Sequence, residues 1–412
     1  MKFSQYSFTP EIINNLEKIG FKKPTDIQYK SIPAIMKGED LLAIAQTGTG
    51  KTAAFAIPII NDIQKKKRNH KESVIRALVM VPTRELAQQI GEVFNKLGKG
   101  TRVNTLALFG GVDQESQIAK LLKGVDVLVT TPGRMFDLHH QRFLNLDKVQ
   151  TLVLDEADHM LDLGFKKDIV DVMDRMPKVR QTLFFSATIN AKIKKTAYDL
   201  IKSNAIRIQI APKDPVSKNI KHSVAFVNMD DKRFFLERLI KENPKSKILV
   251  FVRTKVRAER VKKAMDRVEI ESMTIHGDKA QKDRSSVMNF FRTGKVNVMI
   301  ATDVSARGID IANVDYVVNY DLPDVAENYV HRIGRTGRGK EKGDAVSFCS
   351  KEEKPLLDEI EKFVGKPIKV LELKQDDYRQ TVDFSEDTSL SIKELMGQIE
   401  ELDKKVKKKK KK

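Results

Sequence analysis

Residues 41–60 read LLAIAQTGTGKTAAFAIPII, and this stretch decides the fold. A short apolar run at 41–45 leads into a loop with two glycines, and the apolar run resumes directly after Lys51. That order is typical of a strand, a glycine-rich loop and a helix. Since a helix N-terminus offers unpaired N–H groups and a positive dipole end, such a loop is suited to binding phosphate. The stretch therefore predicts a parallel α/β sheet with a nucleotide site at the carboxyl end of a strand.

The residue types in the loop each suit one part of a nucleotide. Gly48 and Gly50 allow the backbone to approach an anion, Lys51 can reach the β- and γ-phosphates, and the Thr52 hydroxyl can ligate Mg²⁺. The strict pattern begins with glycine, where this chain has Ala45. A glycine-rich turn that merely contains a lysine is the alternative. The expected phosphate-binding residues are Gln46, Thr47, Gly48, Thr49, Gly50, Lys51 and Thr52.

Short apolar runs recur along the whole chain with helical stretches between them. Continuous hydrophobic strands that alternate with helices predict parallel sheets covered on both faces, and here they form two series of similar length. The expected strands are 41–45, 77–81, 105–109, 125–129, 151–154 and 182–185, then 248–252, 272–275, 296–300, 316–319 and 345–348. The expected organisation is a first domain over 1–206, a linker over 207–219, a second domain over 220–370 and an extension over 371–412.

An acidic segment, Asp155-Glu156-Ala157-Asp158, follows the apolar run TLVL. Beside a phosphate loop, one carboxylate can hold Mg²⁺ and a neighbouring one can polarise the attacking water. Read alone, the cluster would be ordinary solvated surface, so its place after a strand is what gives it weight. The chain lacks the asparagine/threonine-lysine-x-aspartate element that reads guanine, which disfavours a GTPase.

Composition bounds the class of protein and its partners. The chain has 412 residues, 41% hydrophobic and 32% charged, which excludes a wholly disordered protein. No apolar run approaches the roughly 20 residues of a membrane helix. One cysteine fits a cytoplasmic location. The net charge of +19, with eight lysines in the last nine residues, favours a nucleic acid partner over a membrane, against the alternative of a merely basic soluble protein.

Further segments resemble a known family, in its order and at its spacing. They are GFKKPTDIQ at 20–28, AQTGTGKT at 45–52, PTREL at 82–86, GG at 110–111, TPGR at 131–134, DEAD at 155–158, SAT at 186–188, ATD at 301–303, RGID at 307–310 and HRIGRTGR at 331–338. Together they resemble the DEAD-box family of ATP-dependent RNA helicases. The resemblance implies two tandem RecA-like domains, with ATP and Mg²⁺ as cofactors. It also implies RNA-stimulated ATP hydrolysis that unwinds short duplexes or remodels RNA–protein complexes.

The resemblance implies an ATP site split between the two domains. In the first, Gln28 and Thr25 would read the adenine, Phe3 and Phe21 would lie at the base, Asp155 would hold Mg²⁺ partly through water, and Glu156 would activate the water. In the second, Arg335 and Arg338 would stabilise charge on the transferring phosphate, His331 would belong to the site, and Asp310 would touch the ribose. Hydrolysis would then require the two domains to close.

The RNA path implied by the resemblance is split in the same way. Contacts to phosphate and 2′-OH groups carry no base code, so binding to single strands or short duplexes would be independent of sequence. Ser186 and Thr188 would couple the ATP site to this path. The expected RNA contacts are Arg84, Gly111, Thr131 and Arg134 in the first domain and Gly277, Arg284 and Thr302 in the second.

Several alternatives stay open. An ATP-gated RNA clamp that scaffolds other proteins, or a DNA helicase, would share most of these motifs. Lys65 to Arg68 are read as a solvated loop or an auxiliary RNA contact, and 391–402 as a short amphipathic helix. We expect a monomer, possible partners in ribosome assembly or RNA decay, and similarity to small bacterial members of the RhlE type.

Overall fold

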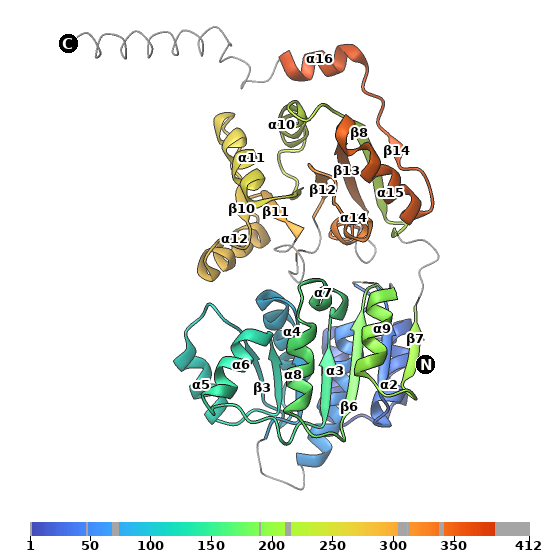
Figure 1. Ribbon diagram of the computed structural model, residues 1–412, viewed down its shortest axis with the longest axis vertical. Coiled ribbons are helices and arrows are strands. Elements are labelled where there is room, and N and C mark those ends of the chain that lie inside the picture. Colours follow the sequence, from blue (N-terminus) through green and yellow to red (C-terminus); the bar gives the residue numbers. More distant parts are fainter. Residues whose placement is uncertain are drawn as a thin grey trace, which may run out of the picture. The chain divides into compact units, whose positions relative to one another are not determined.

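The computed structural model describes residues 2–46, 48–67, 74–188, 191–210, 216–303, 311, 314–337 and 342–383. The chain divides after residue 213 into two compact units (Figure 1). Each unit contains one seven-stranded sheet, and every strand pair is parallel. The two α/β domains expected from the sequence are therefore confirmed.

The sheet of the first unit has the strand order β3-β4-β2-β5-β6-β1-β7. Its strands are β1 (Leu41–Ile44), β2 (Ala77–Met80), β3 (Thr105–Leu108), β4 (Val127–Thr130), β5 (Thr151–Leu154), β6 (Gln181–Ser186) and β7 (Ile206–Gln209). The α-helices of this unit are α1 (Pro10–Ile19), α2 (Asp26–Met36), α3 (Lys51–Lys67), α4 (Arg84–Leu97), α5 (Gln114–Leu122), α6 (Pro132–His140), α7 (Ala157–Asp162), α8 (Lys166–Asp174) and α9 (Ala191–Leu200).

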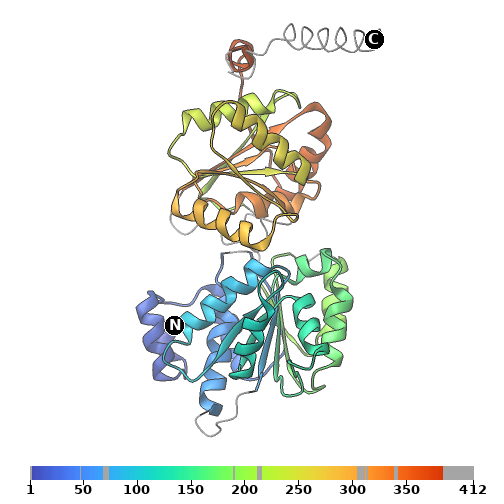
Figure 2. The ribbon, with the colours of Figure 1, turned by 90° about the vertical axis from the view of Figure 1, so that its left-hand side faces the viewer.

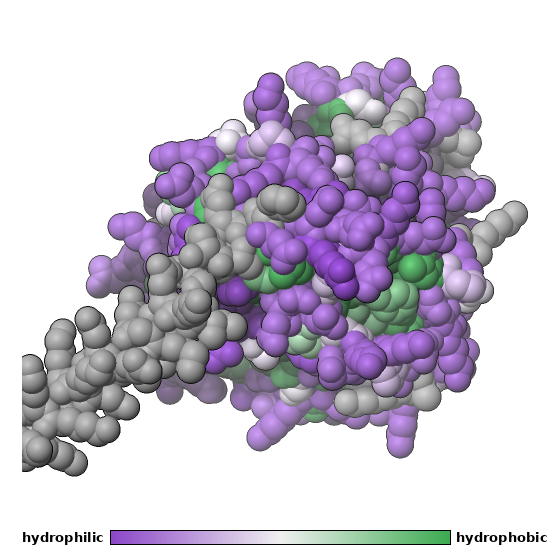
Figure 3. Space-filling model, turned by 90° about the horizontal axis from the view of Figure 1, so that it is seen from above, coloured by the Kyte–Doolittle hydropathy of each residue, from purple (hydrophilic) through white to green (hydrophobic). Residues whose placement is uncertain are grey.

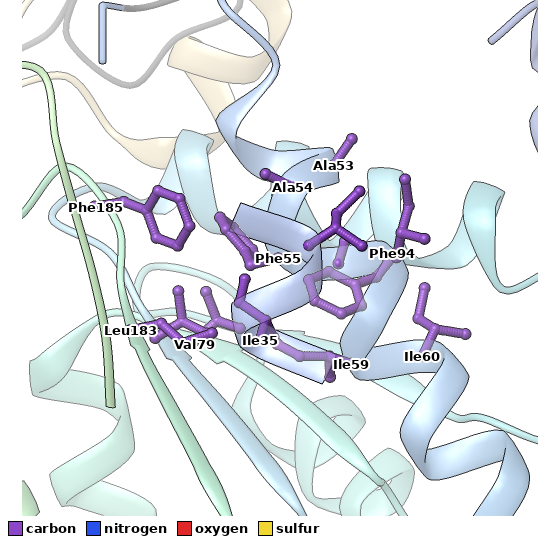
Figure 4. Packing of buried hydrophobic residues seen from close by; sticks show 14 of the residues in the cluster. Ile35, Ala53, Ala54, Phe55, Ile59, Ile60, Val79, Phe94, Leu183 and Phe185 are labelled. Atoms are coloured by element: carbon purple, nitrogen blue, oxygen red, sulfur yellow. The ribbon is translucent and has the colours of Figure 1, made fainter. Parts of the chain in front are cut away.

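The strands read as continuous apolar runs because both faces of the sheet are buried. In β1, Leu41 and Ala43 join one core cluster, whereas Leu42 and Ile44 join the cluster on the other face. Helices cover both faces of the sheet, as the turned view shows (Figure 2). In the first cluster, Phe55 of α3 packs against Phe94 of α4 and Phe185 of β6, with ring centroids 6.1 and 5.2 Å away (Figure 4).

The sheet of the second unit has the order β10-β11-β9-β12-β13-β8-β14. Its strands are β8 (Ile220–Phe226), β9 (Ile248–Val252), β10 (Met273–Ile275), β11 (Val298–Thr302), β12 (Tyr316–Asn319), β13 (Gly343–Cys349) and β14 (Lys369–Val370). The α-helices described in this unit are α10 (Lys232–Glu242), α11 (Lys255–Arg267), α12 (Gln281–Thr293), α14 (Ala326–Ile333), α15 (Lys354–Val364) and α16 (Gln375–Asp383). Two 3-10 turns, η1 (Phe3–Gln5) and η2 (Lys351–Glu353), complete the described elements.

Two local readings of the sequence differ from the structure. Residues 207–209 lie in β7, which pairs with β1, rather than in a linker. Lys65 to Lys67 form the last turn of α3 rather than a loop, because Lys67 is buried there and bonds Asp126 at 2.8 Å. The C-terminal extension contains helix α16, over Gln375–Asp383. The predicted helix at 391–402 and the lysine run lie outside the described residues.

The cysteine, the helices and the surface of the chain each have a notable property. Cys349, the one cysteine in the sequence, is buried at the end of β13, and burial raises the pKa of its thiol to about 11. Among the described residues, no helix combines the length and apolar character needed to cross a membrane. The face seen in Figure 3 is largely hydrophilic, with small hydrophobic patches between charged side chains.

Candidate nucleotide and RNA site

The predicted ATP and coupling residues of the first unit lie at the ends of three neighbouring strands. Lys51 opens the helix after β1, Asp155 directly follows β5, and Ser186 ends β6. Because β5, β6 and β1 are adjacent and parallel, all three residues lie at the same edge of the sheet. This is the carboxyl edge, where open parallel sheets hold their ligands.

The glycines of the phosphate loop occupy backbone conformations that other residues rarely adopt. Gly48 and Gly50 have φ angles of +81° and +91°. A Cβ atom on Gly50 would stand 2.5 Å from Nε2 of Gln28, so a side chain there would displace that glutamine. Lys51 is buried, and its Nζ donates to the carbonyl of Ala45 at 2.7 Å. The loop thus folds around its own lysine at the start of α3.

Gln28 connects this loop to the start of α2. Its Oε1 accepts a hydrogen bond from the Thr25 N–H at 3.0 Å, and its Nε2 donates to the carbonyl of Gly50 at 3.1 Å. The side chain is buried at 3% exposure, whereas Thr25 is exposed. Both ends of the Gln28 amide bond to backbone groups. The bond to Thr25 is a capping box, which the Thr25-x-x-Gln28 spacing could have predicted, whereas nothing in the sequence pointed to the bond with Gly50.

The two predicted aromatic residues differ in access. Phe3 is 3% exposed and belongs to the core of the first unit. Its ring lies 6.1 Å from that of Phe21, which remains half-buried at the core surface. Phe21 is therefore the ring with more surface available to a ligand.

The acidic segment places neighbouring carboxylates in different surroundings. Burial raises the pKa of Asp155 to about 7; nearby Lys51 opposes this shift, and the Glu156 and Asp158 charges add to it. Glu156 has φ 51° and ψ 45°, a left-handed conformation that costs free energy for a residue with a side chain. Such local strain, together with the buried carboxylate beside it, is typical of functional sites.

Asp158 holds the turn that follows β6. Its Oδ2 accepts hydrogen bonds from the N–H of Ala187 at 3.1 Å and from the N–H and hydroxyl of Thr188, both at 2.9 Å. The Ser186 hydroxyl donates to the Thr188 carbonyl at 2.6 Å. The two predicted coupling residues are therefore bonded to the acidic segment within one hydrogen-bonded unit.

The predicted RNA residues of the first unit follow the other half of the sheet. Arg84 begins the helix after β2, Gly111 follows β3, and Thr131 and Arg134 lie at the start of α6, after β4. Since β3, β4 and β2 are adjacent, these residues share the carboxyl edge. Arg134 donates to Oε1 of Gln117 at 3.2 Å and to the Val112 carbonyl at 3.3 Å. Gln117, on α5, is a supporting residue that the sequence reading missed.

In the second unit the predicted RNA residues lie around β10 and β11. Thr302 is the last residue of β11, Gly277 follows the adjacent strand β10, and Arg284 lies on α12. His331 and Arg335 lie on α14 and just after it. Thr47, Asp310 and Arg338 lie outside the described residues.

Arg332, between those two predicted residues, carries no predicted role yet is 2% exposed. Its Nε and Nη2 bond the two carboxylate oxygens of Asp303 at 2.6 and 2.7 Å, and its Nη1 donates to the Asp321 carbonyl at 2.7 Å. This paired, buried arginine joins α14 to the residue after Thr302. Arginines are mostly exposed, and a sequence does not show which of several arginines faces inward.

The residues at the carboxyl edge of the sheet in the first unit fit a magnesium ion. Asp155 and Thr52 offer oxygen atoms, the ligand type that Mg²⁺ prefers. Mg²⁺ keeps much of its water and usually takes one or two carboxylates together with phosphate oxygens. The described residues contain no group of three or more metal-binding side chains, which is compatible with an ion held largely by nucleotide and water.

The comparisons with known proteins now decide the family. The sequence model of the DEAD/DEAH box helicases matches residues 25–196, and that of the helicase conserved C-terminal domain matches residues 231–340. The ATP-dependent RNA helicase CshA of Listeria monocytogenes is 41% identical over 90% of this chain and 70% of that protein. The chain belongs to the DEAD-box ATP-dependent RNA helicases. The predicted family and function are therefore confirmed.

Another relative and a solved structure are similar to this helicase over most of its length. The DEAD-box ATP-dependent RNA helicase RhpA of Helicobacter pylori is 38% identical over 97% of this chain and 80% of that protein. A structure of S. cerevisiae Dbp5 bound to RNA and ADP BeF3 superposes with a TM-score of 0.81 at 31% identity, covering 93% of this chain and 98% of that chain. The RhlE subtype stays a prediction.

Proposed function

We propose that this helicase binds ATP at the carboxyl ends of β1, β5 and β6 and the RNA backbone at the carboxyl ends of β2, β4 and β3. The observation that carries the proposal is that one edge of a single sheet presents both predicted residue sets. The Dbp5 structure that resembles this chain contains RNA and a nucleotide, which supports the same ligands here.

The residues at the ATP edge have distinct proposed tasks. Loop N–H groups and Lys51 would bind the phosphates, while Thr52 and Asp155 would hold Mg²⁺, which supplies charge stabilisation for phosphoryl transfer. Glu156 would accept a proton from the attacking water. Phe21, Thr25 and Gln28 would lie at the base, with Phe3 supporting Phe21 from the core. For Gln28 to read adenine, its bond to the Gly50 carbonyl would have to be exchanged for one to the base.

The second unit would complete the chemistry. Arg335, Arg338 and His331 would act on the phosphates and Asp310 on the ribose, while Gly277, Arg284 and Thr302 would extend the RNA path. Arginines in this role accelerate phosphoryl transfer by about 10³–10⁵. We further propose a cytoplasmic monomer whose RNA binding is independent of sequence, with possible protein partners in ribosome assembly or RNA decay.

Phosphate release, measured with and without RNA, tests the enzyme against the clamp alternative. Wild type should release phosphate faster with RNA. Glu156→Gln should lose at least about 10²-fold in that rate, the contribution expected of a general base, while still binding ATP and RNA. Glu17→Gln on α1, an exposed site, is the matched control. Negligible release by wild type under both conditions would favour the clamp, and full activity in Glu156→Gln would remove the assigned role.

A further inference from the structure

The first unit contains a pocket at the edge of its sheet opposite the phosphate loop. Its volume is about 520 Å³. It is lined by residues at or just before the first residues of three strands: Arg76 before β2, Thr151 in β5 and Gln181 in β6. The last turns of α2 and α3 close its sides through Met36 and Lys66. The ATP residues lie at the other ends of these strands, so this pocket is separate from the proposed active site.

The lining is strongly basic. One carboxylate, that of Asp62, faces five cationic side chains. Two further carboxylates act on the lining from outside it: Asp40 lies 3.6 Å from Lys202, and Asp40 and Asp174 both interact with Arg180. Setting these three carboxylates against the five cations leaves two positive charges. The five cations are Lys65, Lys66, Arg76, Arg180 and Lys202.

Each of the two arginines in the lining has a buried N–H donor for which the described residues provide no acceptor. The Nε atoms of Arg76 and Arg180 are both buried without a hydrogen-bond partner. Arg180 is held by bonds from Nη1 to the carbonyls of Met173 and Pro177, at 3.3 and 2.8 Å. The Nε atoms of Arg134 and Arg257, elsewhere in the chain, share this state, so the cationic lining rather than these two donors distinguishes the pocket.

Neutralisation of a helix end explains only part of this charge. Lys65 and Lys66 lie in the last turn of α3, where cations interact favourably with the helix dipole. Lys66 also bonds Asp62 at 2.7 Å, and Lys65 donates to the Ser7 carbonyl at 2.8 Å. Arg76, however, precedes β2, so the helix dipole gives no reason for a cation there, whereas Arg180 precedes β6 but also bonds the Met173 carbonyl in the last turn of α8.

We propose that this pocket binds a small phosphate-bearing anion with two or more negative charges. Guanidinium groups match phosphate oxygens geometrically, and the lysines add unspecific charge. A small ligand is favoured over RNA because the pocket is a cavity of limited volume at the edge away from the predicted RNA residues of the same unit. The inference does not depend on the proposed residue roles at the ATP edge.

Calorimetric titration of the full chain with inorganic pyrophosphate tests this site. Wild type should bind pyrophosphate at two sites, and Lys51→Ala should remove the one at the phosphate loop. Adding Arg76→Gln, or instead Lys66→Gln, to Lys51→Ala should weaken the remaining site at least about tenfold. The pair of variants guards against a folding defect at either position, which thermal melting would reveal. Arg379→Gln, at an exposed position of α16, removes the same charge elsewhere and should change nothing.

Three results would overturn the proposal. Lys51→Ala could retain no pyrophosphate site at all, or Arg76→Gln and Lys66→Gln could bind as tightly as Arg379→Gln. Alternatively, the two pocket variants could lose affinity for RNA while binding pyrophosphate normally, which would assign the pocket to RNA. If the ATPase test failed while these binding results held, the pocket would stand without the proposed active-site roles.

Discussion

Two carboxylates three residues apart have different roles because their hydrogen bonding differs. Asp155 is 3% exposed beside other carboxylates, and burial raises its pKa to about 7. Asp158 is almost as buried, but its Oδ2 accepts three hydrogen bonds from the turn after β6. Asp158 thus has a structural task in this structure. The negative charge of Asp155 is buried with little to stabilise it, as expected of a carboxylate that binds a cation.

Asp155→Asn should stabilise the protein in the absence of nucleotide and Mg²⁺, and more at high pH than at low pH. Asp155 ionises near its usual pKa of 3.8 when unfolded but at about 7 when folded. The folded state therefore binds more protons between these values, and wild-type stability falls as pH rises through this window. From pH 5 to pH 8, the gain from the substitution should increase by on the order of 2 kcal/mol.

Thermal melting in a chelating buffer measures this gain. Asp147→Asn, at an exposed position, is the control and should show no comparable trend with pH. A gain that is the same at both pH values would contradict the raised pKa. With nucleotide and Mg²⁺ present, Asp155→Asn should instead lose the stabilisation that these ligands give wild type.

At the scale of elements, helix α16 packs against the second unit. The Tyr378 hydroxyl donates to Oδ2 of Asp231 at 2.7 Å and accepts from the Asn228 N–H at 3.0 Å. Its ring lies 4.9 Å from that of Phe235 on α10, and Thr381 accepts a hydrogen bond from Arg238. The start of the C-terminal extension is therefore packed on α10 rather than detached from it.

Tyr378→Phe should lower the unfolding free energy of the second unit by about 1–2 kcal/mol. The change removes a hydrogen bond to a charged group and leaves the Asn228 donor without that acceptor, while the ring contact with Phe235 remains. Urea unfolding followed by circular dichroism gives the value. Tyr198→Phe, at a 37% exposed ring on α9, is the matched control. Equal stability of the two variants would show that the hydroxyl contributes nothing.

Elements could be predicted from the sequence where burial on both faces leaves a continuous apolar run. That holds for β1, β2, β4, β5, β9 and β11. Strand β8 was missed because Lys221, His222 and Ser223 interrupt its apolar run. Helix α16 was missed because Tyr378 and Val382 are its only large apolar residues. The phosphate loop and acidic segment could be predicted from local patterns. The tasks of Arg332 and Gln117 and the bond of Gln28 to Gly50 could not, since each depends on a partner distant in sequence.

At the scale of the whole molecule, each unit has its own sheet and its own buried core. The charge of +19 is concentrated in part at the end of the chain, where residues 404–412 include eight lysines. Charges of this kind attract RNA without regard to sequence, through release of counterions from the phosphates. The tail would then hold RNA near the helicase while its two units act on it.

Deleting residues 404–412 should weaken RNA affinity and flatten its dependence on salt. Each phosphate neutralised on a single strand contributes about −0.7 to the slope of log affinity against log salt, so the eight lysines contribute at most about −5.6. Fluorescence anisotropy across a salt series measures the slope. Replacing the same lysines with glutamine keeps the length and should act like the deletion. ATP turnover without RNA should not change, and an unaltered slope would rule out a tether.

The buried thiol at the end of β13 has a practical consequence. With its pKa raised to about 11 and almost no exposed surface, Cys349 should react slowly with maleimides. The wild-type chain can therefore be used directly for site-directed labelling, because Cys349 need not be replaced first. One engineered surface cysteine in each unit would accept a donor and an acceptor dye, and single-molecule energy transfer could then follow the units through a turnover cycle.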